Sequence, residues 1–194
     1  MPMSHAALLT RRLVDHDPGV VDHAARVTDL ALRLATELDA PPQLLRRLAV
    51  ATPLHDIGKL DVDRGILTKP GPLDDHEVQE IRRHPVAGTE ILQGIQSLRA
   101  ALDTVLHHHE RWDGGGYPHG LHGLDIPEDA RIVAVADAYD AMVSDRPYRA
   151  RCGHADAVAE VERCAGTQFD PAIVEAFSDE LGLRLAPVPA ALAS

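Results

Sequence analysis

The chain has 194 residues, enough for one domain with a real hydrophobic core and too few for a second of similar size. Aromatic residues make up only 3% of it, so we expect an aliphatic core and a helical fold. The net charge of −11 argues against a broad surface for duplex nucleic acid, and no run of eighteen apolar residues predicts a membrane span. We therefore expect a cytoplasmic protein that needs local positive charge to bind an anionic ligand.

Apolar residues at helical spacing predict a series of helices and no strand pair. Asp17-Pro18 is a typical helix start, and the spacing after it predicts a helix over 18–39. A second helix runs from about 44 toward His55-Asp56, and the proline-rich segment 65–73 is expected to be a loop. Further helices are expected at 74–83, 85–94, 97–109, 127–143, 154–165 and 171–181.

The segment from Arg111 to Ile126 contains five glycines and is too irregular for a helix. Such a long connection in a compact domain is typical of a functional loop or of a disordered segment. Four apolar or aromatic side chains predict that it packs on the domain: Trp112, Tyr117, Leu121 and Leu124. We divide the chain into an N-terminal arm over 1–17, a single domain over 18–185 and a flexible tail over 186–194.

The run from His107 to Pro118 reads HHHERWDGGGYP and joins potential metal ligands to freely bending backbone. Imidazole nitrogens and carboxylate oxygens suit borderline divalent metals, and glycines permit the close approaches that an open site requires. The run therefore predicts a metal centre with an accessible face. Taken alone, it is also compatible with an exposed polar loop.

Other candidate ligands lie far from this run. At the end of the second helix, His55 and Asp56 diverge by about 100° around the helix axis, so two metals could share the carboxylate. His84 is expected at a helix N-terminus, and Gly88 leaves that helix face bare so that it can approach a metal.

His23 and Asp137 both fall on apolar helix faces, where their side chains should point inward. A structural role or an ion pair would explain each of them singly. Their occurrence together with the other inward histidines, on separate helices, favours a shared metal site.

The chain resembles a known family in its motifs. His55-Asp56-Ile57-Gly58-Lys59 resembles the HD signature of metal-dependent phosphohydrolases. His108-His109-Glu110, followed by Asp113-Gly114 and Gly116-Tyr117-Pro118, resembles the signature of the HD-GYP subgroup. The resemblance spans roughly Val20 to Phe177. It implies an all-α fold, a single HD-superfamily helical bundle with a long glycine-rich GYP loop, and cyclic di-GMP phosphodiesterase activity.

The resemblance also implies a set of metal ligands, with Asp56 bridging: His23, His55, Asp56, His84, His108, His109 and Asp137. Some relatives hold a third metal through a glutamate four residues before the first histidine, and here that position is Gly19. We therefore expect two divalent ions. Histidine-rich, carboxylate-bridged coordination fits iron or manganese, while zinc and nickel stay open.

Further roles follow from the same resemblance. Asp56 and Lys59 are implied to be catalytic, and Lys59 and Arg146 match phosphate contacts, although surface ion pairs would also explain both cations. Tyr117 either stacks near a guanine or anchors the loop in the core. The residues expected to support ligands without binding metal are Glu110, Asp113 and Asp140. Three more histidines match no ligand position and are expected in solvent: His107, His119 and His122.

The leading hypothesis is hydrolysis of cyclic di-GMP to pGpG, or onward to GMP, in bacterial second-messenger signalling. One alternative is an HD phosphohydrolase for another nucleotide, such as a hybrid cyclic dinucleotide, and another is a non-enzymatic docking module. The resemblance implies that the GYP loop contacts diguanylate cyclase domains. Because only about 17 residues precede the first long helix, we expect no sensor domain and regulation by a partner, expression level or metal state. The sequence does not indicate the oligomeric state.

Overall fold

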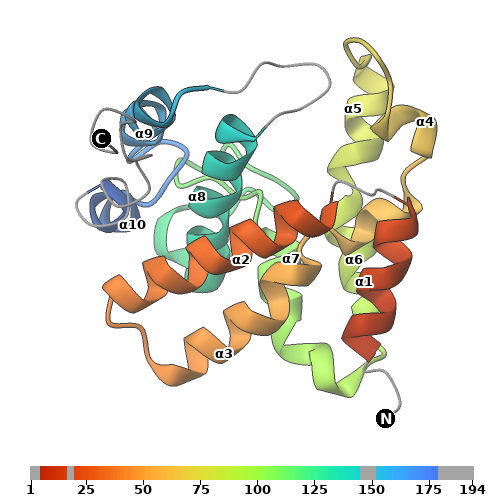
Figure 1. The fold of residues 1–194 in the computed structure, drawn as a ribbon, viewed down its shortest axis with the longest axis horizontal. Coiled ribbons are helices and arrows are strands. Elements are labelled where there is room, and N and C mark those ends of the chain that lie inside the picture. Colours follow the sequence, from red (N-terminus) through yellow and green to blue (C-terminus); the bar gives the residue numbers. More distant parts are fainter. Residues whose placement is uncertain (1–4, 17–19, 145–151, 179–194) are drawn as a thin grey trace, which may run out of the picture.

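The computed structural model describes residues 5–16, 20–144 and 152–178 of the chain (Figure 1). These residues contain no strand, and two isolated β-bridges are their only β-type pairings. The expected all-α fold is thus confirmed. In chain order, with η for 3-10 helices, the helices are α1 (His5–His16), α2 (Val20–Glu37), α3 (Pro42–Ala51), η1 (Thr52–Leu54), η2 (Ile57–Asp61), α4 (Arg64–Leu67), α5 (Asp75–Arg82), α6 (His84–Leu92), η3 (Gln96–Ala101), α7 (Leu102–His107), η4 (Gly123–Asp125), α8 (Glu128–Val143), α9 (His154–Arg163) and α10 (Pro171–Ala176).

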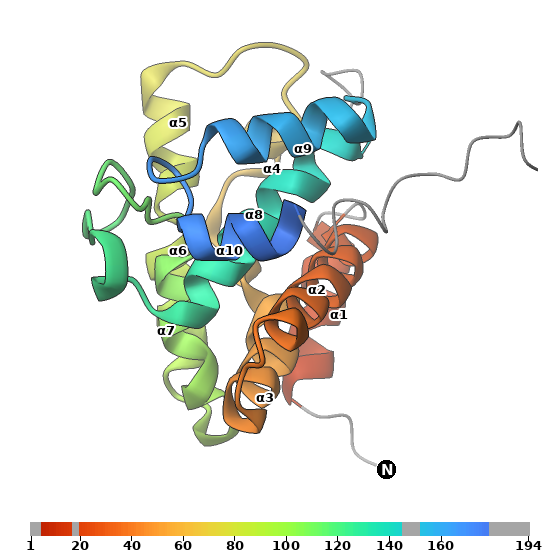
Figure 2. The same ribbon diagram turned by 90° about the vertical axis from the view of Figure 1, so that its left-hand side faces the viewer.

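Two clusters of buried aliphatic residues hold these helices together. In the first, α2 packs against α3 and α8, and α9 and α10 cover α8 (Figure 2). In the second, α1, η1 and η2 pack against α6 and α7 around Leu54, Ile57 and Val105, which are fully buried. The turn between η1 and η2 follows the end of α3. Because η1 contacts α2 and α7, and η2 contacts α6, this turn lies where the three helices converge.

The arm expected over residues 1–17 contains the packed helix α1. Leu9 and Leu13 lie four residues apart, so they share one helix face, and both are buried in the second cluster. The ring of His16 contacts the carbonyl of Val62, with 3.2 Å between Nε2 and the oxygen. Two leucines suffice to bury a short helix, although they form no apolar run. The predicted tail, 186–194, lies outside the described residues.

Three helix boundaries differ from the prediction. The second helix ends at Ala51, before the HD pair, because Pro53 has no N–H to continue the α-helical hydrogen bonds. The loop expected over 65–73 begins within α4, and the helix expected over 97–109 is divided into η3 and α7. Among the described helices, none combines the length and apolar character that a membrane span requires.

The glycine-rich loop is irregular, as expected, and its backbone is fixed to a distant segment. The amides of Trp112 and Asp113 donate to the carbonyls of Gln168 and Thr167, at 3.1 and 2.8 Å. Leu124 is 77% exposed, so the prediction that it packs on the domain was wrong. Its position in the short helix η4 turns it to solvent, whereas backbone hydrogen bonds hold the segment around Trp112.

Candidate metal centre

The HD pair lies in the turn between two 3-10 helices. His55 follows η1 and Asp56 precedes η2, and both side chains are buried. Gly58, two residues later, faces Gly88 of α6: a Cβ on Gly58 would lie 1.9 Å from the carbonyl oxygen of His84. The bare face of Gly88 was expected to approach a metal, but it packs on this glycine. The close contact carries His84 to the edge of the HD turn.

Three histidines are oriented by the same device. The Nδ1–H of His55, His84 and His108 donates to the carbonyl of the residue three positions earlier, at 2.7, 2.7 and 2.9 Å. A carbonyl only accepts, so Nδ1 carries the proton in each neutral ring and Nε2 has a free lone pair. Hydrogen bonds of this kind commonly orient histidines that bind metals through the other nitrogen.

The free lone pairs converge on one place. Nε2 of His84 lies 3.2 Å from Nε2 of His108, and the buried Nε2 of His55 has no hydrogen-bond partner among the described residues. Two facing lone pairs repel each other unless a cation lies between them. Two nitrogens bonded to one metal at about 2.1 Å would be roughly 3.0 to 3.4 Å apart, which agrees with the observed spacing. The donors therefore fit a metal ion.

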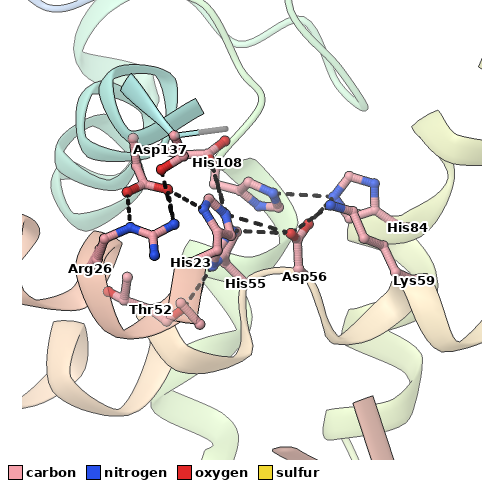
Figure 3. A network of polar contacts seen from close by, with 12 residues as sticks. His23, Arg26, Thr52, His55, Asp56, Lys59, His84, His108 and Asp137 are labelled. Atoms are coloured by element: carbon pink, nitrogen blue, oxygen red, sulfur yellow. Dashed lines mark hydrogen bonds and ion pairs between the residues drawn. The ribbon is translucent and has the colours of Figure 1, made fainter. Parts of the chain in front are cut away.

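All seven predicted ligands meet here, in two groups, and Figure 3 labels all of them except His109. Within each group, ligand atoms lie within 4.8 Å of one another: Asp56, His84, His108 and His109 in the first, and His23, His55 and Asp137 in the second. Asp56 contacts both groups, because its Oδ1 is 3.4 Å from His84 Nε2 and its Oδ2 is 3.5 Å from His55 Nε2. Its carboxylate is placed to bridge two ions.

Cations on the chain hold the carboxylates ionised. Nζ of Lys59 lies 2.6 Å from Oδ2 of Asp56. Burial alone would raise the pKa of Asp56, but Lys59 and the neighbouring His55 hold it well below its usual value. The lysine predicted to act in catalysis thus lies against the carboxylate that is predicted to bridge the metals.

His23 is held between two carboxylates of α8. Its Nε2 lies 3.2 Å from Asp137 and its Nδ1 lies 2.7 Å from Asp140, while Nε of Arg26 donates to Asp140 at 2.6 Å. Burial alone would lower the pKa of His23, but its contacts with Asp137 and Asp140 raise it to about 9. His109 differs, because burial and the nearby His84 lower its pKa to about 4.

A pocket of about 280 Å³ lies beside the centre, lined by His109 and Asp137 on one side and by the glycine-rich loop on the other. The ring of Tyr117 stacks on His109 at a centroid distance of 4.9 Å, and the guanidinium of Arg82 lies 5.3 Å from the Tyr117 centroid. Burial raises the pKa of Tyr117, so its hydroxyl stays protonated. Tyr117 therefore contacts a candidate ligand directly at the edge of the pocket.

Comparison with known families aligns residues 7–173 with the HD domain. The chain belongs to the HD-domain family. It is 41% identical over 180 residues to cyclic di-GMP phosphodiesterase PA4108 of Pseudomonas aeruginosa, covering 92% of this chain and 43% of that protein. It is 38% identical over 176 residues to 3'3'-cGAMP-specific phosphodiesterase 3 of Vibrio cholerae, covering 89% and 38%. The chain thus spans less than half the length of these two relatives.

The fold also matches solved HD domains. The HD domain of the L. monocytogenes phosphodiesterase PgpH, in complex with cyclic di-AMP, superposes with a TM-score of 0.67. The match covers 95% of this chain and 98% of that one at 18% identity. At this identity the likeness shows the fold, and it agrees with the single helical bundle expected from the motifs.

Within this HD domain, two expected ligand supports serve the loop instead. The carboxylate of Glu110 accepts the backbone N–H groups of His119 and Leu121, at 2.7 and 3.1 Å. Asp113 pairs with Arg111 and accepts the amide of Gly115, which lowers its pKa to about 2. Both carboxylates brace the glycine-rich turn by accepting hydrogen bonds from its backbone N–H groups.

Asp140 was expected to support a ligand, and it contacts His23. The sequence did not predict two other residues of the site, Arg26 and Arg82. Arg26 lies three residues after His23 and so on the same side of α2, a spacing that could have suggested their shared carboxylate. Arg82 lines the pocket from the end of α5, and nothing in its local sequence indicates this. Two predicted positions, Gly19 and Arg146, lie outside the described residues.

Metal binding near neutral pH should release about one proton from His23. With a pKa of about 9 the metal-free ring is protonated at pH 7, whereas a ligand must be neutral. Apparent metal affinity should therefore rise as the pH increases from 7 toward 9, by up to about tenfold per unit. Calorimetry of manganese binding in buffers with different ionisation enthalpies measures the release. Heats that are independent of the buffer would contradict this role of His23.

Proposed function

We propose that this HD domain is a metal-dependent phosphodiesterase that hydrolyses cyclic di-GMP to pGpG, or onward to GMP. The observation that carries the proposal is the bridging position of Asp56 between two groups of buried ligands, beside a pocket with a cationic wall. The identity to cyclic di-GMP phosphodiesterase PA4108 supports the choice of substrate. A phosphodiester in the pocket would lie beside the centre.

We propose that the seven side chains gathered in the two groups hold a pair of divalent ions. When bound, such a pair supplies an activated water and neutralises the charge that develops on phosphorus. Asp56 would bridge the pair, and Asp140 would orient His23 through Nδ1. The mixed imidazole and carboxylate donors support iron or manganese, with zinc or nickel as the alternatives.

Substrate positioning would come from groups around the pocket. Arg82 lines the pocket beside Tyr117, and Lys59 pairs with Asp56 of the centre, so the two cations would attract an anionic phosphodiester. The resemblance adds Arg146 as a further phosphate contact. The ring of Tyr117 stacks on His109, which favours the anchoring role. Tyr117 also lines the pocket, so it would contact a base bound there.

The test is turnover of cyclic di-GMP by protein loaded separately with iron(II), manganese, zinc or nickel, with products resolved by chromatography. We expect pGpG to accumulate, and elemental analysis to account for about two metal ions at the seven-residue centre of each chain. Absence of cleavage with all four metals, in protein that contains them, would contradict the proposal and favour a docking role.

A second substrate is supported by a specific comparison. The relative named 3'3'-cGAMP-specific phosphodiesterase 3 is nearly as similar in sequence as the cyclic di-GMP relative. The two dinucleotides share their phosphodiester backbone and differ in one base, so the same centre could act on both. Parallel assays with equal concentrations of cyclic di-GMP and 3'3'-cGAMP decide between them. Preferential cleavage of 3'3'-cGAMP would identify it as the substrate in place of cyclic di-GMP.

Replacing Arg82 with alanine should raise KM for the cleaved dinucleotide by about tenfold and change kcat little, because the lost contact binds the phosphodiester before and during reaction alike. Steady-state kinetics measure both constants. Arg83→Ala is a matched control, since its exposed neighbouring side chain lines a different pocket, beside Glu80 and Glu90. Equal KM values for the two variants would exclude Arg82 from substrate binding.

A further inference from the structure

A separate group of metal-binding side chains lies at the base of the glycine-rich loop. It consists of His107, the last residue of α7, with Glu110 and His119. None of them belongs to the seven-residue centre, and the intervening His108 and His109 do. The group therefore occupies another side of the same short segment.

The imidazole of His107 has a buried nitrogen that no hydrogen bond satisfies among the described residues. This nitrogen, Nδ1, lies 3.7 Å from Oε1 of Glu110. The expectation that His107 is in solvent was wrong, because its side chain is only 12% exposed. A buried polar atom without a partner costs about 1 to 3 kcal/mol, so some group should satisfy this nitrogen.

Glu110 can supply a second donor without giving up its role in the loop. Its side chain is fully buried, and each oxygen accepts one backbone N–H, from His119 and from Leu121. A carboxylate oxygen has two lone-pair positions, so Oε1 keeps one on the side of His107. Both hydrogen bonds come from neutral amides, and neither neutralises the buried negative charge.

His119 completes the group from the solvent side. Its ring centroid lies 5.3 Å from that of His107, and ligand atoms of the three residues lie within 4.8 Å of one another. The side chain of His119 is exposed, so its ring is free to rotate toward an ion. Two donors on a tetrahedral ion would be about 3.4 Å apart, close to the spacing of His107 and Glu110.

We propose that His107, Glu110 and His119 form a loop cation site that binds one borderline divalent ion, with zinc as the best match to two imidazoles and a carboxylate. The exposed position of His119 leaves a fourth position open to water. A bound ion would join the end of α7 to residue 119, and so hold the loop that presses Tyr117 against His109. The site is independent of the proposed phosphodiesterase reaction.

The test measures zinc per chain in the 194-residue protein, by elemental analysis after removal of metal and equilibrium dialysis against micromolar Zn²⁺. We expect His119→Ala to bind one equivalent less than the wild-type protein, with zinc affinity at this site weakened by more than about tenfold. The backbone bond from residue 119 to Glu110 survives this change. His122→Ala, an exposed histidine of the same loop, is the matched control and should keep the full count.

Two further measurements fix the interpretation. His119→Gln should lose the same equivalent, and thermal unfolding of each variant should show that it is folded. In an Asp56→Asn background the zinc bound at the centre should fall while the loop equivalent stays, and His119→Ala should then remove it. Equal zinc counts for His119→Ala, His122→Ala and wild type would overturn the proposal. Failure to cleave any dinucleotide would leave this difference in zinc intact.

Discussion

Replacement of Asp56 by asparagine is expected to abolish most metal binding and to reduce phosphodiesterase activity by roughly a thousandfold or more. The carboxylate lies 3.4 and 3.5 Å from nitrogens in the two ligand groups, so its charge is available to both ions. Asparagine keeps the size of the side chain but removes that charge. Lys59, which lies 2.6 Å away, then loses its ion pair with Asp56, and its positive charge opposes the binding of further cations.

Metal content by elemental analysis and turnover of cyclic di-GMP measure these two effects separately. Asp61→Asn is the matched control, because Asp61 ends the 3-10 helix η2 that follows Asp56, and its side chain is exposed. It should retain metal and activity. If Asp56→Asn kept two ions per chain, the carboxylate would not be the bridge, and the two groups would have to hold metals independently.

The seven candidate ligands show what sequence can establish about the site. Their types and inward positions predicted a metal centre, and the structure gathers all seven, although the ligand roles remain to be tested. The local geometry around Asp56 was predicted less well. A helix was expected to reach the HD pair, yet Pro53 ends the α-helical hydrogen bonds, and the pair lies in a turn between 3-10 helices. The HD motif could still be identified, because it is defined by the order of residues along the chain and not by the type of helix around them.

The contacts that sequence did not predict depend on how the loop folds back. Glu110 follows two candidate ligands, so a role beside them was a reasonable expectation, but its oxygens bind amides nine and eleven residues later. His107 is buried for the same reason, since the returning chain brings His119 over it. The path of an irregular loop has no periodic signal, and its hydrogen bonds become visible only in three dimensions.

The packing of α6 on η2 leads to the second large effect. Gly58→Ala should lower the free energy of unfolding by about 3 kcal/mol or more, because the new Cβ would lie 1.9 Å from the carbonyl oxygen of His84. Backbone atoms on both sides of the contact prevent a cheap adjustment. The helix must move away, and it carries His84 with it. Metal affinity should therefore fall together with stability, by at least about tenfold.

Denaturant unfolding of the metal-free protein measures the first effect, and manganese titration of the folded variant measures the second. Gly94→Ala is the control, because its Cβ would meet no atom within 4 Å, and its stability should stay within about 0.5 kcal/mol of wild type. Wild-type metal affinity in a destabilised Gly58→Ala protein would mean that His84 keeps its place when α6 shifts. The glycine of the HD motif would then serve folding alone, whereas joint loss of both properties would show that the close approach of α6 builds the centre.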